Sequence, residues 1–397
     1  MHFTIKIVSM TSYLFIGRLD REKGIDILID AFLAHHTQHP EDILHICGVW
    51  AYTDKIKGIA HNEWYIIYHG RVWKEAIKHH IQSCDYMIMP STFLETFGLT
   101  ALESLMLGTP VIGNKKWWCE PFIHPLLHID TDNIQTAPKD LANTLDSISR
   151  WNITKDIFTD RIHNIQKNFT AESRAKSISH IIQHHTVILM SDYNNKQLGG
   201  IETHLDTIQS KLHAMWYNIH LRQSGWLPWM KWKIQRLWHM FLSIYNWKPW
   251  SWLSHRIHWD GTIWYHSILR HIGWYTLAQI QKVKYASHTK PHKPTLQTMI
   301  TYHDLGLFHP FPHSVSHIQQ LPAAWSLRWR ICSARTRNPL IIVAVIYKYI
   351  LISLIHKQLR QSIDIHIVPS WFMQDIVHQR HPDAHCIILP HFIDMHR

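Results

Sequence analysis

Two glutamates and a glycine form the group of residues with the clearest chemical potential. Glu95 and Glu103 are separated by seven residues in FLETFGLTALESLMLGTPVIG, with Gly98 between them and an apolar helical run behind. Such a loop aims backbone N–H groups and a helix N-terminus at a bound anion, which suits a diphosphate. The helical carboxylate is placed to accept hydrogen bonds from ribose hydroxyls, and the loop carboxylate to reach a sugar ring. Taken alone, the spacing also suits an ordinary helix with solvated glutamates.

Two cations precede this group. Arg18 and Lys23 lie in GRLDREKG, a loop between an apolar strand and a helix. Taken alone they would be surface charges. The many histidines show no HExxH or Cys/His finger spacing, so the sequence predicts no metal site.

Length and composition define the class of protein. A chain of 397 residues exceeds the size at which one core usually keeps growing, which predicts two domains. Hydrophobic residues at 46% and charged residues at 17% indicate a globular protein. The formal charge of +11 favours anionic partners such as sugar nucleotides or lipid head groups. Five scattered cysteines and a start without a signal-peptide pattern predict a reduced, cytoplasmic protein.

Strand and helix patterns alternate along the chain, as in α/β proteins. The alternation runs to about residue 183 and starts again at TVILMSDY (186–193), followed by Gly199, Gly200 and an amphipathic helix. Later strands are expected in TMITYHDLGLF (298–308), DIHIVPS (364–370) and CIILP (386–390). We therefore expect two Rossmann-like, doubly wound α/β domains, at 1–183 and 186–397.

Two segments have compositions that are also found in membrane-spanning or membrane-binding segments. The apolar run at 338–355 approaches the length of a span of about 20 residues, but Lys348 interrupts it, so a buried or interfacial helix is expected. The basic, aromatic stretch at 227–250 could lie on an anionic membrane surface.

Tryptophan is unusually frequent and glycine unusually rare. The chain has 20 Trp and 14 Gly, whereas glycine makes up roughly 7% of an average chain. Trp216 stands between an amphipathic helix and a strand, where a left-handed residue belongs and a β-carbon is unfavourable. Trp50, Trp73, Trp117 and Trp118 also lie in strand-to-helix turns. We hypothesise that many of these tryptophans come from UGA codons that the source organism decodes as glycine. The alternative is a Trp-rich protein with membrane-interface anchors.

The stretch from Pro90 to Gly113 resembles the signature of GT-B glycosyltransferase family 4, with Ser104 in place of the usual alanine. The resemblance implies that the loop cations bind the donor diphosphate, that Glu103 binds the ribose and that Glu95 contacts the sugar hydroxyls. The donor-binding residues that it implies are Arg18, Lys23, Thr96, Phe97, Gly98, Leu99 and Glu103.

Residues in the second half resemble the acceptor domain of the same family. LGGIETH is similar to the family's opening Gly-Gly loop, which places Gly199 and Gly200 on the acceptor side, and TYHDLGLFHP places His303 near the transferred sugar. The catalytic residues implied by the resemblance are Glu95, His303, Arg18 and Lys23.

The order of the two halves is reversed relative to the family, in which the acceptor domain comes first. Two interpretations fit: a circular permutation, or the tail of one transferase gene joined in frame to the head of the next. The short join at SISHIIQHHTVILMSDY favours the second.

The resemblance implies a retaining, metal-independent transferase that moves a hexosyl unit from an NDP-sugar to a hydroxyl acceptor in glycolipid or cell-envelope polysaccharide assembly. The NDP-sugar would be a substrate, so no cofactor is expected, and no nucleic-acid partner is expected either. The protein would be cytoplasmic, or peripheral at the inner face of the membrane. Two alternatives remain: a catalytically incompetent fusion that only binds nucleotide sugars, and a sugar-nucleotide epimerase.

Overall fold

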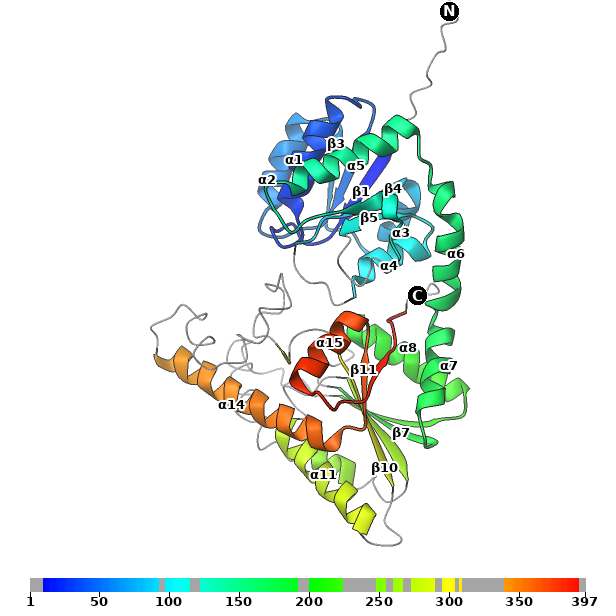
Figure 1. Ribbon diagram of the computed structural model, residues 1–397, viewed down its shortest axis with the longest axis vertical. Coiled ribbons are helices and arrows are strands. Elements are labelled where there is room, and N and C mark those ends of the chain that lie inside the picture. The colour runs from blue at the N-terminus through cyan, green and yellow to red at the C-terminus, as the bar shows by residue number, and fades with distance from the viewer. Residues whose placement is uncertain are drawn as a thin grey trace, which may run out of the picture. The chain divides into compact units, whose positions relative to one another are not determined.

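The chain folds into two α/β units (Figure 1). The computed structural model describes residues 10–92, 97–114, 122–191, 200–223, 248–254, 260–266, 273–289, 295–303, 307–308 and 339–392. Unit 1 extends to Thr170, and unit 2 begins at Ala171. Each unit contains one six-stranded parallel sheet, which confirms the expected α/β class with two doubly wound domains.

Unit 1 is built on a sheet with the strand order β3-β2-β1-β4-β5-β6. The consecutive residues Tyr13 and Leu14 point to opposite faces of the central strand β1, and both are completely buried. Helices therefore cover both faces, as a parallel sheet requires. The elements of this unit are β1 (Ser12–Ile16), α1 (Ile25–His36), β2 (Ile43–Cys47), α2 (Thr53–Asn62), β3 (Ile66–Gly70), α3 (Lys74–Ser83), β4 (Tyr86–Met89), α4 (Leu99–Met106), β5 (Val111–Asn114), β6 (His128–Ile129), α5 (Ala137–Trp151) and α6 (Thr159–Asn168).

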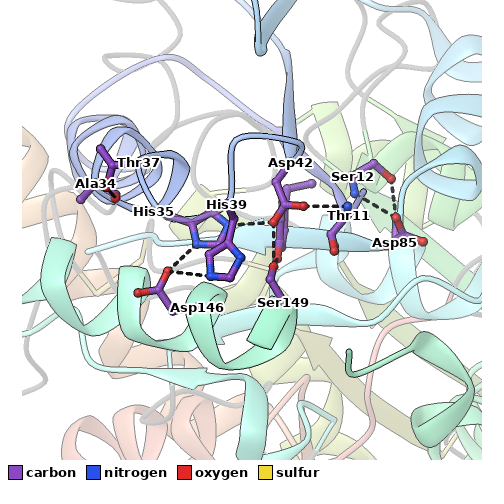
Figure 2. A network of polar contacts seen from close by, with 11 residues as sticks. Thr11, Ser12, Ala34, His35, Thr37, His39, Asp42, Asp85, Asp146 and Ser149 are labelled. Carbon is purple, nitrogen blue, oxygen red and sulfur yellow. Dashed lines mark hydrogen bonds and ion pairs between the residues drawn. The ribbon is translucent and has the colours of Figure 1, made fainter. Parts of the chain in front are cut away.

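A buried histidine ties α1 to α5 (Figure 2). The two ring nitrogens of His35 lie 2.6 Å from Asp146 Oδ1 and 2.9 Å from Asp42 Oδ2. Asp42 also accepts hydrogen bonds from the Thr11 backbone N–H and the Ser149 hydroxyl. Because Thr11 precedes β1 and Asp42 precedes β2, this network lies at the amino-terminal edge of the sheet.

Unit 2 has the strand order β12-β11-β10-β9-β7-β8. All its strand pairs are parallel, and β10 and β9 form the centre, with completely buried residues such as Met299 and Trp264. The elements are α7 (Ala171–Ile181), β7 (Thr186–Ser191), α8 (Gly200–Ala214), β8 (Asn218–Gln223), α10 (Lys248–Ser254), β9 (Gly261–Tyr265), α11 (Gly273–Thr289), β10 (Leu296–Thr301), α14 (Pro339–Ser362), β11 (Ile365–Val368), α15 (Trp371–Arg380) and β12 (Cys386–Ile388).

Helix α7 belongs to the second unit, whereas the sequence analysis extended the first domain to residue 183. Ala171 and Ile178 share one hydrophobic core with Val187 on β7 and Ile208 on α8. An amphipathic helix shows in its sequence that it has an apolar face, but not which sheet that face will cover. The junction between the two units is thus a helix built into the core of unit 2.

Helix α14 contains the apolar run at 338–355. Leu351, Ile355 and Leu359 are buried on it, while Val343 and Ile350 are exposed. Among the described residues, no helix is long and apolar enough to cross a membrane. The basic stretch at 227–250 lies outside the described residues up to position 247.

Three helices end in the same way, with a left-handed residue after the last turn. Gly108, Asn152 and Trp216 have φ angles of 89°, 46° and 68°. At each end, the residue that follows donates its N–H to the carbonyl five residues back, as Tyr217 does to Leu212 at 3.1 Å. This is the Schellman arrangement, in which glycine or asparagine is the usual left-handed residue.

The left-handed backbone expected at Trp216 is therefore confirmed. Trp50 and Trp73 do lie in strand-to-helix turns, but neither is among the described residues with positive φ, so the backbone there does not require glycine. Trp117 and Trp118 lie outside the described residues.

Candidate functional site

The strand order of unit 1 places a ligand site between β1 and β4. Connections run from β1 through β2 to β3 on one side, and from β4 through β5 to β6 on the other. The loops after β1 and β4 therefore diverge at the carboxyl edge of the sheet, which is where open α/β sheets bind ligands. Arg18 and Lys23 follow β1, and the Pro90–Gly98 loop follows β4. The polar network around His35 lies at the opposite edge.

Acidic residues of the loop after β1 bind the Arg18 side chain and the backbone of Lys23. Arg18 lies 3.4 Å from Asp20 and 3.1 Å from Glu22, and one third of its side chain is exposed. Asp20 also accepts a hydrogen bond of 2.9 Å from the backbone N–H of Lys23. The carboxylates thus orient the loop, and a phosphate that binds Arg18 must compete with them.

The loops after β1 and β4 are in direct contact. The Thr92 backbone N–H donates to the Glu22 carbonyl at 2.9 Å. Gly24 has a φ of 72°, and a Cβ at this position would lie 2.0 Å from the Pro90 carbonyl oxygen. Only glycine fits both requirements. The lysine loop is therefore fixed against the loop that leads to α4.

Helix α4 begins with the backbone geometry that the sequence predicted for an anion site. Gly98 precedes it with a φ of 65°, and no side chain caps the helix. The Ala101 N–H already donates to the Gly98 carbonyl at 3.0 Å, so the N–H groups of Leu99 and Thr100 are the donors that an anion at this helix start would use. Phe97 is buried, Leu99 is exposed, and Glu103 is half-buried on the helix. Glu95 and Thr96 lie outside the described residues.

On the acceptor side, Gly200 is the first residue of α8, and Gly199 lies outside the described residues. His303 follows β10, and its Nε2 lies 3.0 Å from Nδ1 of His266, which follows β9. Its ring also stacks on His391 with centroids 5.3 Å apart. Burial, together with the charge of nearby Arg174, lowers the pKa of His303 to about 3, so this histidine is neutral at physiological pH.

The sequence analysis did not identify the neighbours of His303. His204, His266 and His391 come from three separate elements, and Arg174 comes from α7. Among 36 histidines, the only local signal was that some immediately follow a strand. Their proximity to one another depends on the strand order, which the sequence pattern does not specify.

One group in the described part of the chain has ligand atoms close enough for a metal ion: His35, His39 and Asp146. Both ring nitrogens of His35 already contact carboxylate oxygens. A metal ion would have to replace the proton shared with Asp146 and break the link between α1 and α5. The arrangement is therefore that of a structural hydrogen-bond network.

Comparison with known proteins gives matches to part of the chain. An uncharacterized 41.2 kDa protein in the cps region of Klebsiella pneumoniae is 30% identical over 108 residues, or 25% of this chain and 26% of that protein. An uncharacterized glycosyltransferase of Methanocaldococcus jannaschii is 32% identical over 105 residues, with the same coverage of 25% and 26%. The chain thus matches about a quarter of the length of these curated relatives.

Among solved structures, sucrose-phosphate synthase from Thermosynechococcus elongatus is 22% identical with a TM-score of 0.36, covering 44% of this chain and 45% of that one. The family whose sequence model matches is described as "Glycosyl transferases group 1", and the match covers residues 10–120. The matched segment contains every donor-side residue discussed above, and it is this part of the chain that is similar to group 1 glycosyl transferases.

Proposed function

We propose that the protein transfers a hexosyl unit from an NDP-sugar to a hydroxyl acceptor, with retention of configuration, as a member of GT-B family 4. One observation carries this proposal. Within the segment similar to group 1 glycosyl transferases, Lys23 and the uncapped start of α4 lie on two interlocked loops at the switch point of the sheet. A diphosphate is the ligand that suits a fixed cation and a free helix N-terminus together.

Each donor-side residue then has a separate task. Lys23 and Arg18 stabilise the negative charge that develops on the departing nucleoside diphosphate, which is electrostatic catalysis by preorganised groups. Glu103 accepts hydrogen bonds from the ribose, and Glu95 orients the sugar ring. Thr96, Phe97, Gly98 and Leu99 form the loop around the phosphates. No metal ion and no cofactor are needed in this scheme.

The acceptor side is assigned to unit 2. His303, held neutral by burial, can donate or accept one hydrogen bond at the transferred sugar, and Gly199 and Gly200 are assigned to the same acceptor side. We expect a hydroxyl acceptor of the glycolipid or cell-envelope polysaccharide class, and a cytoplasmic protein that works at the inner face of the membrane. The two domains stand in reversed order in this proposal, with α7 as the junction between them.

The test compares Lys23→Met with Lys57→Met, which removes an exposed lysine from α2. Purified full-length variants are incubated with a panel of NDP-sugars, and donor binding and nucleotide release are both measured. We expect Lys23→Met to lower nucleotide release by about 100-fold or more, the usual loss when one electrostatic contact to the developing charge is removed, and Lys57→Met to behave as wild type.

Three results would go against the proposal. Donor binding without any release of nucleotide by the wild type would favour the incompetent fusion. Interconversion of the donor sugar without transfer would favour an epimerase. Full turnover by Glu95→Ala would refute the assignment of the sugar-contacting residue.

A further inference from the structure

Arg174 occupies an unusual position on α7. The buried residues of this helix are Ala171, Arg174, Ala175 and Ile178, a spacing that forms one stripe facing the core of unit 2. Arg174 is only 3% exposed, although it stands in a stripe that is otherwise apolar. A buried guanidinium is expected to have its charge and its donors paired, because desolvation of an unpaired charge is strongly unfavourable.

Most of the guanidinium donors of Arg174 are not used. Nη1 donates to the Pro390 carbonyl at 2.9 Å. Nε and Nη2 are buried and have no hydrogen-bond partner among the residues that the structure describes. Burial lowers the pKa of Arg174 to about 9, which leaves the group charged at neutral pH. The protein therefore holds a buried positive charge with a free pair of donors, the geometry that binds two oxygens of one anion.

Four histidines lie near this charge, because Arg174 donates to the residue before His391 and its charge lowers the pKa of all four. We call the five residues the Arg174 cluster. The ring of His204 on α8 lies 5.8 Å from His266, 5.4 Å from His303 and 5.6 Å from His391, measured between centroids. Within the described part of the chain, the Nε2 atoms of His204 and His266 are also buried without a partner. The members of the Arg174 cluster are Arg174, His204, His266, His303 and His391.

The histidines of the Arg174 cluster have strongly lowered pKa values, as expected for buried groups beside a positive charge. Burial lowers the pKa of His204 and of His266 well below the usual range, and Arg174 and the other cluster histidines add to this effect. The pKa of His391 is also lowered well below its usual range, chiefly by burial and then by His303 and Arg174. The interior of unit 2 thus collects cationic and potentially cationic groups from four elements around Arg174.

The location is the one at which an α/β sheet binds a ligand. In the order β12-β11-β10-β9-β7-β8, the connections change direction between β7 and β9. His266 follows β9 directly, and His204 lies on the helix that comes after β7. The cluster therefore stands at the carboxyl edge beside the switch point of the second sheet.

We infer that the Arg174 cluster is a binding site for one oxyanion, a phosphate group, held by the free Nε and Nη2 donors of Arg174 and by the ring nitrogens of His204 and His266. This site lies in unit 2, uses residues that the donor scheme does not use, and does not depend on glycosyl transfer. The phosphate group can belong to a phosphorylated acceptor or to a nucleoside diphosphate, which the test distinguishes.

The test measures binding of inorganic phosphate, glycerol 3-phosphate and UDP to the full-length protein by titration calorimetry in chloride buffer of fixed ionic strength. Arg174→Met removes the charge at similar volume, and Lys176→Met removes an exposed cation from the same helix as a matched control. We expect Arg174→Met to weaken phosphate binding about 30-fold or more, as loss of a buried charged contact usually does. Lys176→Met should bind as wild type.

The source of the phosphate group is identified by which of the ligands binds and by whether its binding needs Arg174 or Lys23. Glycerol 3-phosphate binding that needs Arg174 but not Lys23 identifies a phosphorylated acceptor. UDP binding that Arg174→Met weakens, without binding of glycerol 3-phosphate, identifies a nucleoside diphosphate. Phosphate binding retained in a protein without any transferase turnover would support the site while refuting the proposed function.

Two further measurements keep the inference testable if Arg174→Met is difficult to interpret. Without phosphate, Arg174→Met should be at least as stable as wild type, because it removes an unpaired buried charge, whereas loss of a purely structural arginine would destabilise the protein. Phosphate affinity of the wild type should rise as the pH falls from 8 to 6, because a bound anion raises the lowered pKa values of the histidines and so couples binding to proton uptake. His204→Gln should reduce this increase in phosphate affinity between pH 8 and pH 6. Absence of phosphate binding, or equal binding by wild type and Arg174→Met, would overturn the inference.

Discussion

Replacement of Trp216 by glycine should stabilise the protein. Trp216 is the left-handed residue that ends α8, with a φ of 68°, and 90% of it is exposed. A left-handed backbone costs an L-residue about 1–2 kcal/mol. Glycine adds about 0.5–1 kcal/mol of chain entropy to the unfolded state, which offsets part of the gain. Because so little of the indole is packed, we expect Trp216→Gly to raise the unfolding free energy of unit 2 by about 0.5–1 kcal/mol.

The matched control is Trp151→Gly. Trp151 is also exposed, at 74%, but it is the last residue of α5 and keeps a helical backbone, with the left-handed position taken by Asn152. Glycine there should destabilise by up to about 1 kcal/mol. Urea unfolding followed by circular dichroism measures both variants without relying on tryptophan fluorescence. If both substitutions changed the free energy of unfolding in the same direction, the argument from the left-handed backbone at Trp216 would be refuted.

The remaining predictions concern the identity of the tryptophans, the donor loop and the acid stability of unit 1. If UGA is decoded as glycine in the source organism, the intact mass of the natively produced protein should fall below the 47.2 kDa of the printed sequence by the mass difference between Trp and Gly at each such position, and the genomic DNA should show UGA there. A native mass equal to the sequence mass would exclude the hypothesis. Gly24→Ala should destabilise unit 1 by about 2–4 kcal/mol, from left-handed strain together with the clash on Pro90, and should abolish donor binding. Gly58→Ala, where a Cβ meets no neighbour, is its control in calorimetric unfolding. For Asp42, burial raises the pKa, but hydrogen bonds from His35, Ser149 and the Thr11 N–H outweigh it, so the pKa lies below 3.8. The stabilisation is therefore present above about pH 4 and is lost as the pH falls through the folded-state pKa. The stability difference between wild type and Asp42→Asn should shrink over that acid range, and a difference independent of pH would contradict the network.

Local physical chemistry accounts for what could be predicted without the structure. Short apolar runs became the strands of two parallel sheets, because buried parallel strands need apolar residues on both faces. The left-handed residue at Trp216 followed from the end of one amphipathic helix and the start of the next strand. Gly98 at the start of α4 followed in the same way from the loop-to-helix pattern. Each of these features depends on residues that are close together in the chain.

The sequence by itself therefore determined the α/β class and the strands and helices, and it predicts the donor-side residues of unit 1. Only the tertiary structure decided that α7 packs on unit 2, that Gly24 lies against Pro90, and that Arg174 stands among histidines. These contacts join segments far apart in the chain, so they depend on strand order and on which helix covers which sheet. An amphipathic pattern states that a face will be buried, but packing alone determines what that face meets.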